Sequence, residues 1–587
     1  MWSLRSAATY RRSIAALAVL LVASACTSAE AGVSTTSATD AAQPVTTTTT
    51  AAAAAPDPTT TTVTLPRDCS IDPEPGEPVF ETIEETDLAA AALFLSRNHF
   101  RCSDLVVIAP ADDLAVIVVA AQLAAAGRGS LLLFSEAAST QLNDELARLA
   151  PTRTVLMEVA PEWLSVPSGE VEVLSGSLTE LADLALRAGG AVARVGREGT
   201  GPSTIAEALL SISTGRTITA PTRAAAECDP GSPEAAAAIA RAADERAAGG
   251  ETWLIDVCSP GLALLAGAAL GGEGTALLVD GRDLRGHRSV VSAMHAGSEE
   301  ITRIHIAGEM SGDADWHLGT LLAGTELPGG GLLLFPGRRL VALYGNPATP
   351  YLGVLGEQGV EEAIERARRV AEPYGADGVE VLPAFEIIAS VASVSAGSDG
   401  DYSSEMSVEV LLPWVEAAGR EGVYVVLDLQ PGRSDFLDQA RLYEELLLLP
   451  HVGLALDPEW RLKPNQVHLT QIGSVDAAEV NRVAEWLANL VRANRLPQKL
   501  LIVHQFNLSM ITNRGSIERP PELAVMIHAD GQGPIGTKYT TYSTLTGRPD
   551  ADQWWWGWKN FYDEDSPTPT PEQVLDLDPL PSYVSYQ

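Results

Sequence analysis

Two short runs decide the fold expected for the second half of the chain: Val-Tyr-Val-Val-Leu-Asp, from Val423 to Asp428, and Val-Gly-Leu-Ala-Leu-Asp-Pro-Glu-Trp, from Val452 to Trp460. A run that is apolar on both faces is typical of a buried parallel strand, which needs a helical crossover to its neighbour. The residues between the runs, Ser434 to Leu449, carry leucines and acids at helical spacing. The stretch therefore predicts a β–α–β unit whose strands end at carboxylates.

The same alternation of strand and helix continues on both sides of this unit. Pro328 to Gly331 predicts a domain boundary, and residues 332–587 beyond it have the length of a (β/α)8 (TIM) barrel. Six strands are predicted, and Trp554–Tyr562 is a candidate seventh. Closure of the barrel by eight strands is therefore inferred rather than read directly from the sequence. The six predicted strands are Leu340–Tyr344, Val379–Phe385, Val423–Asp428, Val452–Asp457, Leu500–His504 and Ala524–His528.

Polar residues follow every one of these strands. A single such residue often caps the next helix, but repetition at each strand favours convergence at the barrel mouth, where the carboxyl ends of the strands meet. We expect one pocket lined by Glu386, Asp428, Asp457, Glu459, His504 and Asp530. Further binding residues are expected to be Tyr344, Trp460, Gln505 and His528.

Paired carboxylates in such a mouth suit glycoside hydrolysis, which needs one protonated and one ionised carboxyl group. We expect Glu459 to be the acid/base, with a raised pKa, and Glu386 to be the nucleophile or base. Asp457 belongs to the same catalytic group; with Asp428 and Asp530 it would orient the pair or bind sugar hydroxyls. The alternative function is a non-catalytic glycan-binding or scaffold protein that keeps the barrel.

Several side chains have a structural interpretation beside the functional one. The tryptophans from Trp554 to Trp558 are expected mainly in the core, and His504 and His528 are as readily core histidines as site residues. No metal is expected, because Asp457, His504, His528 and Asp530 lack close ligand spacing. No cofactor is expected either: the Gly-rich Gly267–Gly274 has no lysine and the wrong spacing for a phosphate loop.

Charge and the first residues indicate where the protein works. The formal net charge of −37 argues against a nucleic-acid partner, whose binding needs clustered Lys and Arg.

Residues 1–26 predict an export signal ending in Ala-Ser-Ala-Cys, which resembles a bacterial lipobox with Cys26 as the lipidated residue; simple secretion is the alternative. Residues 27–66, rich in Ala and Thr, predict a disordered linker that holds the folded part away from the membrane.

Four further cysteines, an even number in a chain predicted to be exported, suggest disulfides. Of three connectivities we favour local pairing, Cys69 with Cys102 and Cys228 with Cys258; free buried cysteines are the alternative.

The region 67–327 repeats one order of strands and helices twice. Strand, helix and strand are predicted at Asp104–Ala109, Leu114–Ala126 and Leu131–Phe134, and again at Thr252–Val257, Pro260–Leu270 and Ala276–Val279. Such alternation implies doubly wound parallel sheets.

Parts of this region resemble the cell wall-binding repeat 2 family. The resemblance is carried by Ala109-Pro-Ala-Asp-Asp-Leu, by Leu131-Leu-Leu-Phe-Ser and by Ala193-Arg-Val-Gly-Arg197 followed by Ser203-Thr-Ile-Ala206. It departs from the family in having two copies rather than three, no Tyr after Arg197, and Pro260-Gly261 at the second helix entry. The resemblance implies attachment to a wall polysaccharide; a generic α/β spacer is the alternative.

The second half resembles the glycoside-hydrolase-like barrels appended to actinobacterial surface proteins. The phrases that carry this resemblance are Leu454-Ala-Leu-Asp-Pro-Glu-Trp460, Leu501-Ile-Val-His-Gln-Phe506 and Pro581-Ser-Tyr-Val-Ser-Tyr-Gln587. It implies a barrel fold and a place in the cell envelope, and it maps no established catalytic motif onto the chain.

Overall fold

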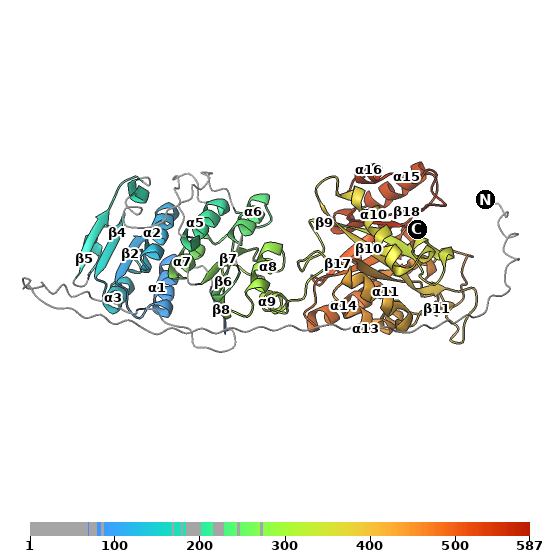
Figure 1. Ribbon diagram of the computed structural model, residues 1–587, viewed down its shortest axis with the longest axis horizontal. Helices are drawn as coiled ribbons and strands as arrows, with labels where there is room; N and C mark the ends of the chain where they lie inside the picture. The colour runs from blue at the N-terminus through green and yellow to red at the C-terminus, as the bar shows by residue number, and fades with distance from the viewer. Residues whose placement is uncertain are drawn as a thin grey trace, which may run out of the picture. The chain divides into compact units, whose positions relative to one another are not determined.

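A computed structural model describes residues 69, 79–83, 87–166, 169–177, 180–183, 201–214, 228–243, 247–270 and 274–587 (Figure 1). The predicted export signal with Cys26, the linker and the stretch Ala193–Arg197 lie outside these residues. Within the described ranges, no helix combines the length and the apolar character needed to cross a membrane.

The N-terminal region contains two parallel four-stranded sheets, as the alternation of strand and helix predicts. The first has the order β3-β2-β4-β5, with bounds Ser130–Phe134, Leu105–Pro110, Arg153–Met157 and Glu170–Leu174. The second has the order β1-β8-β6-β7, with bounds Val79–Ile83, Ile301–Ala307, Gly250–Asp256 and Thr275–Val279. Sequence analysis did not predict β1 or β5.

Helices between the two sheets supply a shared apolar core (Figure 1). Helices α2 (Leu114–Ala126) and α7 (Pro260–Leu270) are apolar all round and almost wholly buried, which is typical of helices packed on every side. The remaining helices are α1 (Leu88–His99), α3 (Ser139–Leu149), α5 (Pro202–Thr214), α6 (Pro233–Ala242), α8 (Arg288–Ala296) and α9 (Ala314–Leu322).

Both expected disulfides are present in this region. Cys69 pairs with Cys102 and Cys228 with Cys258, with Cα–Cα distances of 4.8 and 5.6 Å. These distances lie within the range that a disulfide spans, about 4.4 to 6.8 Å.

One partly buried polar network lies beside the second sheet. The Glu251 carboxylate Oε1 lies 2.7 Å from Nε2 of His99 and 2.6 Å from Nε2 of His305. The Trp253 indole N–H donates to the same oxygen at 3.2 Å, and its ring stacks on His305 at 4.2 Å. The pKa of Glu251 is lowered because its bonds to the two histidines outweigh burial, and the pKa of His99 is raised because its bond to Glu251 outweighs burial.

The C-terminal region is a closed barrel of eight parallel strands, which confirms the predicted fold class. The sequence predicted six strands and a candidate seventh, and the eighth, β19, closes the barrel by pairing with β9. In order the strands are β9 (Arg338–Gly345), β10 (Glu380–Ala392), β12 (Tyr424–Leu429), β13 (Val452–Leu456), β15 (Lys499–Gln505), β17 (Leu523–Ala529), β18 (Trp555–Asn560) and β19 (Tyr583–Tyr586).

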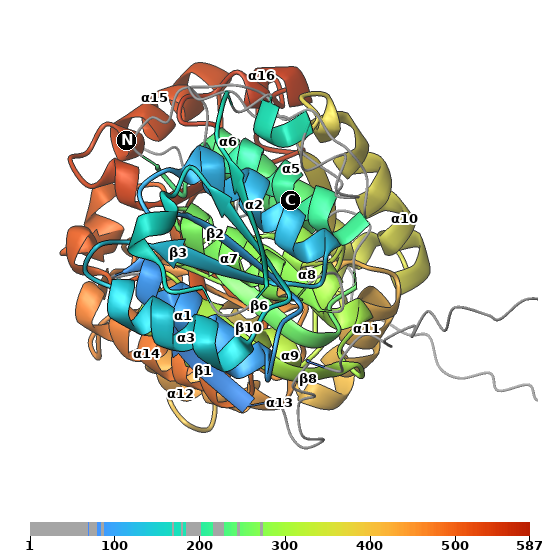
Figure 2. The same ribbon diagram turned by 90° about the vertical axis from the view of Figure 1, so that its left-hand side faces the viewer.

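Helices surround this barrel in a ring (Figure 2). The predicted helix Ser434–Leu449 is instead two short helices, α12 (Phe436–Leu442) and α13 (Glu444–Leu447), because the chain turns at Tyr443, whose hydroxyl donates to the Ala389 carbonyl at 2.8 Å. The other main helices are α10 (Val360–Ala371), α11 (Val408–Arg420), α14 (Ala477–Ala493), α15 (Ile535–Thr546) and α16 (Pro571–Leu575).

The barrel interior changes character along its axis. Toward the amino ends of the strands it is filled by apolar side chains such as Leu340, Leu500 and Met526, with Phe335 packed against them. Along each strand, successive side chains alternate between interior and exterior, so the next interior positions toward the carboxyl ends include Tyr344, His504 and His528. The apolar layers fix the strands, and the polar residues lie above them.

Candidate active site at the carboxyl ends of the barrel strands

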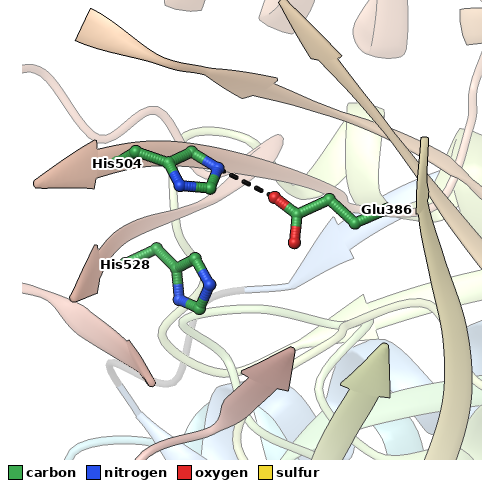
Figure 3. A group of neighbouring side chains, drawn as sticks. All are labelled: Glu386, His504 and His528. Atoms are coloured by element: carbon green, nitrogen blue, oxygen red, sulfur yellow. Dashed lines mark hydrogen bonds and ion pairs between the residues drawn. The ribbon is translucent and has the colours of Figure 1, made fainter. Parts of the chain in front are cut away.

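A buried histidine links two carboxylates at the barrel mouth. Nε2 of His504 lies 2.8 Å from Oε1 of Glu386, and Nδ1 lies 3.0 Å from Oδ2 of Asp530 (Figure 3 shows the Glu386 contact). The pKa of His504 is raised well above its ordinary value, because these carboxylates and Asp428 outweigh burial. Both ring nitrogens therefore donate, and the imidazolium holds Glu386 and Asp530 in place.

Two tyrosines each donate a hydrogen bond to one further carboxylate oxygen of this layer. The Tyr583 hydroxyl donates to Oε2 of Glu386 at 2.9 Å, so both oxygens of Glu386 are engaged. The Tyr344 hydroxyl donates to Oδ2 of Asp428 at 2.8 Å. Burial raises the pKa of both tyrosines well above the ordinary value, which keeps their hydroxyls as donors.

Three of the expected acids have raised pKa values. Burial, followed by the charge of Asp530, raises the pKa of Glu459 to about 7, as expected for a proton donor. Burial raises the pKa of Asp428 to about 6, and Glu386 adds to the effect. The pKa of Asp457 is raised well above its ordinary value by burial and by repulsion from Asp428, Asp530 and Glu459. Mutual repulsion of this kind requires that these carboxyl groups lie close together.

Glu459 differs from the other acids in its exposure. It lies on a short 3-10 turn, Pro458–Trp460, and is half-buried, whereas Glu386 and Asp428 are fully buried. Asp457 caps this turn, since its Oδ1 accepts the Glu459 backbone N–H at 3.1 Å. The turn therefore places Glu459 where solvent or a ligand can reach it.

His528 fits the core-histidine interpretation more closely. Its Nε2 lies 2.8 Å from the Ser585 hydroxyl, and it packs edge-on against His504 and Tyr583. Burial and the neighbouring cations lower its pKa well below the ordinary value, so the ring is neutral.

Sequence analysis missed Lys559, the second cation of the mouth. Its side chain is buried, and its Nζ lies 3.4 Å from the centre of the Tyr344 ring. Lys559 also lowers the pKa values of Asp428 and Glu459. Its signal in the sequence is the alternation of inward and outward side chains along the strand. Gly557 and Lys559 are in register with the interior residues Tyr583 and Ser585. Trp556 and Trp558 point outward into the helical layer.

The structure places other expected residues away from the acids. The Gln505 amide oxygen accepts from Arg514 at 2.8 Å, on the side of β15 opposite to His504. Trp460, beside Glu459, is half-buried and packs edge-on against His468 at 5.4 Å. Trp554, Trp556 and Trp558 lie in the apolar core between the barrel and its surrounding helices, as the structural interpretation expects.

One group in the described residues has the proximity needed for metal binding. One ligand atom each from Glu386, His504 and His528 lie within 4.8 Å of one another (Figure 3). In this geometry both nitrogens of His504 already face carboxylates, and Nε2 of His528 faces Ser585. Hydrogen bonds engage both nitrogens of His504 and Nε2 of His528, whereas Nδ1 of His528 has no hydrogen-bond partner among the described residues. The absence of a metal stays a prediction.

Comparison with known proteins yields only distant likenesses. No protein-family model matches the chain, and no curated protein is similar to it. Two solved structures, "Cwp8 from Clostridium difficile" and "Cwp6 from Clostridium difficile", are each 11% identical, with TM-scores of 0.32 and 0.33. The matches cover 42% and 63% of this chain, and 52% and 65% of those chains.

Proposed function

We propose that the protein is an envelope glycoside hydrolase whose barrel mouth cleaves a polysaccharide outside the cell. Glu459 is the general acid, because it is half-buried and its pKa of about 7 leaves it substantially protonated near neutrality. The observation that carries the proposal is that Glu459 interacts with the charges of Asp530 and Asp457 at the carboxyl ends of the strands.

We assign Asp530 as the ionised partner that acts as nucleophile or base. His504 donates to its Oδ2, and Asp530 lies near enough to Glu459 to raise its pKa. Glu386 was expected in this role, but its full burial and its bonds to His504 and Tyr583 favour a positioning role. Asp457 orients Glu459 through the turn that it caps.

The rest of the chain would deliver this barrel to its substrate. We propose that residues 1–26 direct export, that Cys26 carries a lipid and that residues 27–66 form a linker. Residues 67–327 would attach to wall polysaccharide, and residues 332–587 would form the hydrolase domain. Two disulfides support an exported protein, because disulfides persist in oxidising compartments.

The test is a screen of purified protein against envelope polysaccharides, comparing wild type with Glu459→Gln. General acid catalysis contributes roughly 10²- to 10⁴-fold, so the variant should lose about that much kcat while its melting temperature is unchanged. Glu485→Gln, on an exposed face of α14, is the matched control and should keep full activity.

Two outcomes would contradict the hydrolase. Equal activity of wild type and Glu459→Gln would remove Glu459 from the mechanism. Binding of a glycan without release of any reducing end would favour the alternative, a non-catalytic glycan-binding or scaffold protein.

A further inference from the structure

The barrel mouth holds more acids than cations. Within the part of the chain that the structure describes, Glu386, Asp428, Asp457, Glu459 and Asp530 lie there with two basic side chains, His504 and Lys559, and with the neutral His528. A further lysine close by, Lys538, is already paired with Asp565 at 2.9 Å. A ligand that carries a carboxylate or phosphate would add to this repulsion, whereas a cationic ligand would relieve it.

Two of these acids, Asp428 and Asp457, have a carboxyl oxygen that no described donor reaches. Oδ1 of the fully buried Asp428 accepts no hydrogen bond from any described residue, and its nearest cation, Nε2 of His504, is 3.8 Å away. Asp457 uses Oδ1 for the Glu459 N–H, and no described donor reaches its second oxygen. A buried carboxylate oxygen without a partner is costly, which makes Oδ1 of Asp428 a marker for a ligand; Oδ1 of Asp530 is buried without a partner as well.

The strand register brings these two residues to neighbouring strand ends. Asp428 of β12 is in register with Ala455 of β13, and Asp457 lies two residues beyond Ala455, directly after β13 ends at Leu456. Repulsion from Asp428 is the largest unfavourable charge effect on Asp457 after burial. Among the described residues, a set of three ligand atoms close enough for a metal ion occurs only at Glu386, His504 and His528, and the aspartate pair is not part of that set.

We propose that Asp428 and Asp457 recognise the protonated amine of an N-deacetylated amino sugar, so that the substrate is a cationic hexosamine polysaccharide. This inference rests on the proposed hydrolase function and names its substrate class. An ammonium group donates up to three charge-assisted hydrogen bonds and favours the ionised form of both carboxyl groups, which a sugar hydroxyl or an N-acetyl group does not. The amine contact is separate from the Glu459 and Asp530 pair, which stays free for catalysis.

The test measures binding by the full chain carrying Glu459→Gln, so that turnover does not intervene. Isothermal titration at about pH 6, where a hexosamine amine is protonated, compares three probes: oligomers of β-1,4-glucosamine, their N-acetylated counterparts, and oligogalacturonate. The free-amine oligomer should bind at least about tenfold more tightly than the N-acetylated one, and oligogalacturonate should bind most weakly.

Two isosteric variants place the preference on named residues. Added to the Glu459→Gln background, Asp428→Asn and Asp457→Asn should each remove the preference while the weaker binding of the N-acetylated oligomer persists. Asp563→Asn, an exposed acid after β18, is the matched control and should keep the preference. Thermal unfolding of each variant shows whether it is folded.

Three results would overturn the inference. They are equal or tighter binding of the N-acetylated or uronate oligomers, a preference that survives both aspartate variants, and absence of binding by all three probes. Failure of the hydrolase proposal is seen separately, because wild type would then cleave no polysaccharide in the screen even if glucosamine oligomers bind.

Discussion

The described residues contain two histidine–carboxylate networks that are built in opposite proportions. In the N-terminal region one carboxylate, Glu251, serves His99 and His305. In the barrel one imidazole, His504, serves Glu386 and Asp530. In the first network the single carboxylate of Glu251 lies between hydrogen-bond donors. In the second network further acids surround His504, among them Asp428 and Glu459 with raised pKa values.

The difference separates a structural network from a chemical one. Glu251 has its pKa lowered, as expected for a group that serves stability, whereas the barrel acids have theirs raised toward the range of proton transfer. Burial disfavours the charged form of a group in both networks. The number of partners available to each charged group therefore decides whether its pKa is raised or lowered.

The largest effect that tests this comparison is on stability at the barrel centre. His504→Gln removes a buried cation between two buried carboxylates, and breaking such a pair costs about 3 to 5 kcal/mol. We expect that loss in the free energy of unfolding of the barrel, measured by urea denaturation with tryptophan fluorescence. His468→Gln is the control, since half-buried His468 makes one bond, to the Tyr402 carbonyl, and should cost about 1 kcal/mol. Equal losses in the two variants would contradict the central role of His504.

The contribution of the N-terminal network to stability should depend on pH over a range set by the pKa values of His99 and Glu251. The raised pKa of His99 makes its contribution complete below its ordinary value of 6.5 and lost as pH rises through the raised value. The lowered pKa of Glu251 makes its contribution complete above its ordinary value of 4.5 and lost as pH falls through the lowered value. The network therefore stabilises most between pH 4.5 and 6.5.

Glu251→Gln should accordingly cost about 2 kcal/mol at pH 5.5 and less at pH 8.5, by calorimetric unfolding of the full chain. Glu172→Gln breaks a partly exposed pair with Arg153 and should show no such dependence. A cost of Glu251→Gln that is the same at both pH values would show that His99 does not change its charge in this range.

The barrel network predicts a smaller, graded effect on rate. A general acid works only when protonated, so hydrolysis should fall as pH rises through about 7, by about tenfold per pH unit. The measurement is kcat/KM against pH on the glycan that the screen identifies. A rate that stays constant from pH 7 to pH 9 would exclude Glu459 as the acid.

The smallest expected effect is that of metal removal. Because hydrogen bonds already engage His504 and His528, dialysis against a chelator should leave melting temperature and activity unchanged, and added Zn²⁺ should restore nothing. A chelator-sensitive melting temperature would instead assign a metal to Glu386, His504 and His528.

The convergence of the barrel acids could be predicted from the sequence because it rests on local signals. An apolar run followed by Asp428 or Asp457 identifies a strand end, and parallel closure brings such ends together. The position of Glu386 in the network could not be predicted, since Tyr583 and His504, which engage its two oxygens, lie 197 and 118 residues away in the chain.

Two other misses share one physical cause. The strand β19 is four residues long, and only its pairing with β18 and β9 defines it. Lys559 is hidden among tryptophans that belong to the core, and its inward direction follows from the strand register. Local sequence pattern predicts the strands and helices. Pairing between strands that are distant in the chain determines which side chains lie together.

The closing strand β19 also determines when, during folding, the buried cluster of the barrel is completed. It joins β18 to β9, the first barrel strand, and it supplies Tyr583 and Ser585 to the buried cluster. Contacts between the two ends of a domain form late, because the chain must first give up the entropy of a long loop. During synthesis the earlier strands therefore hold an unfinished cluster, and Glu386 receives its second hydrogen bond only when β19 docks.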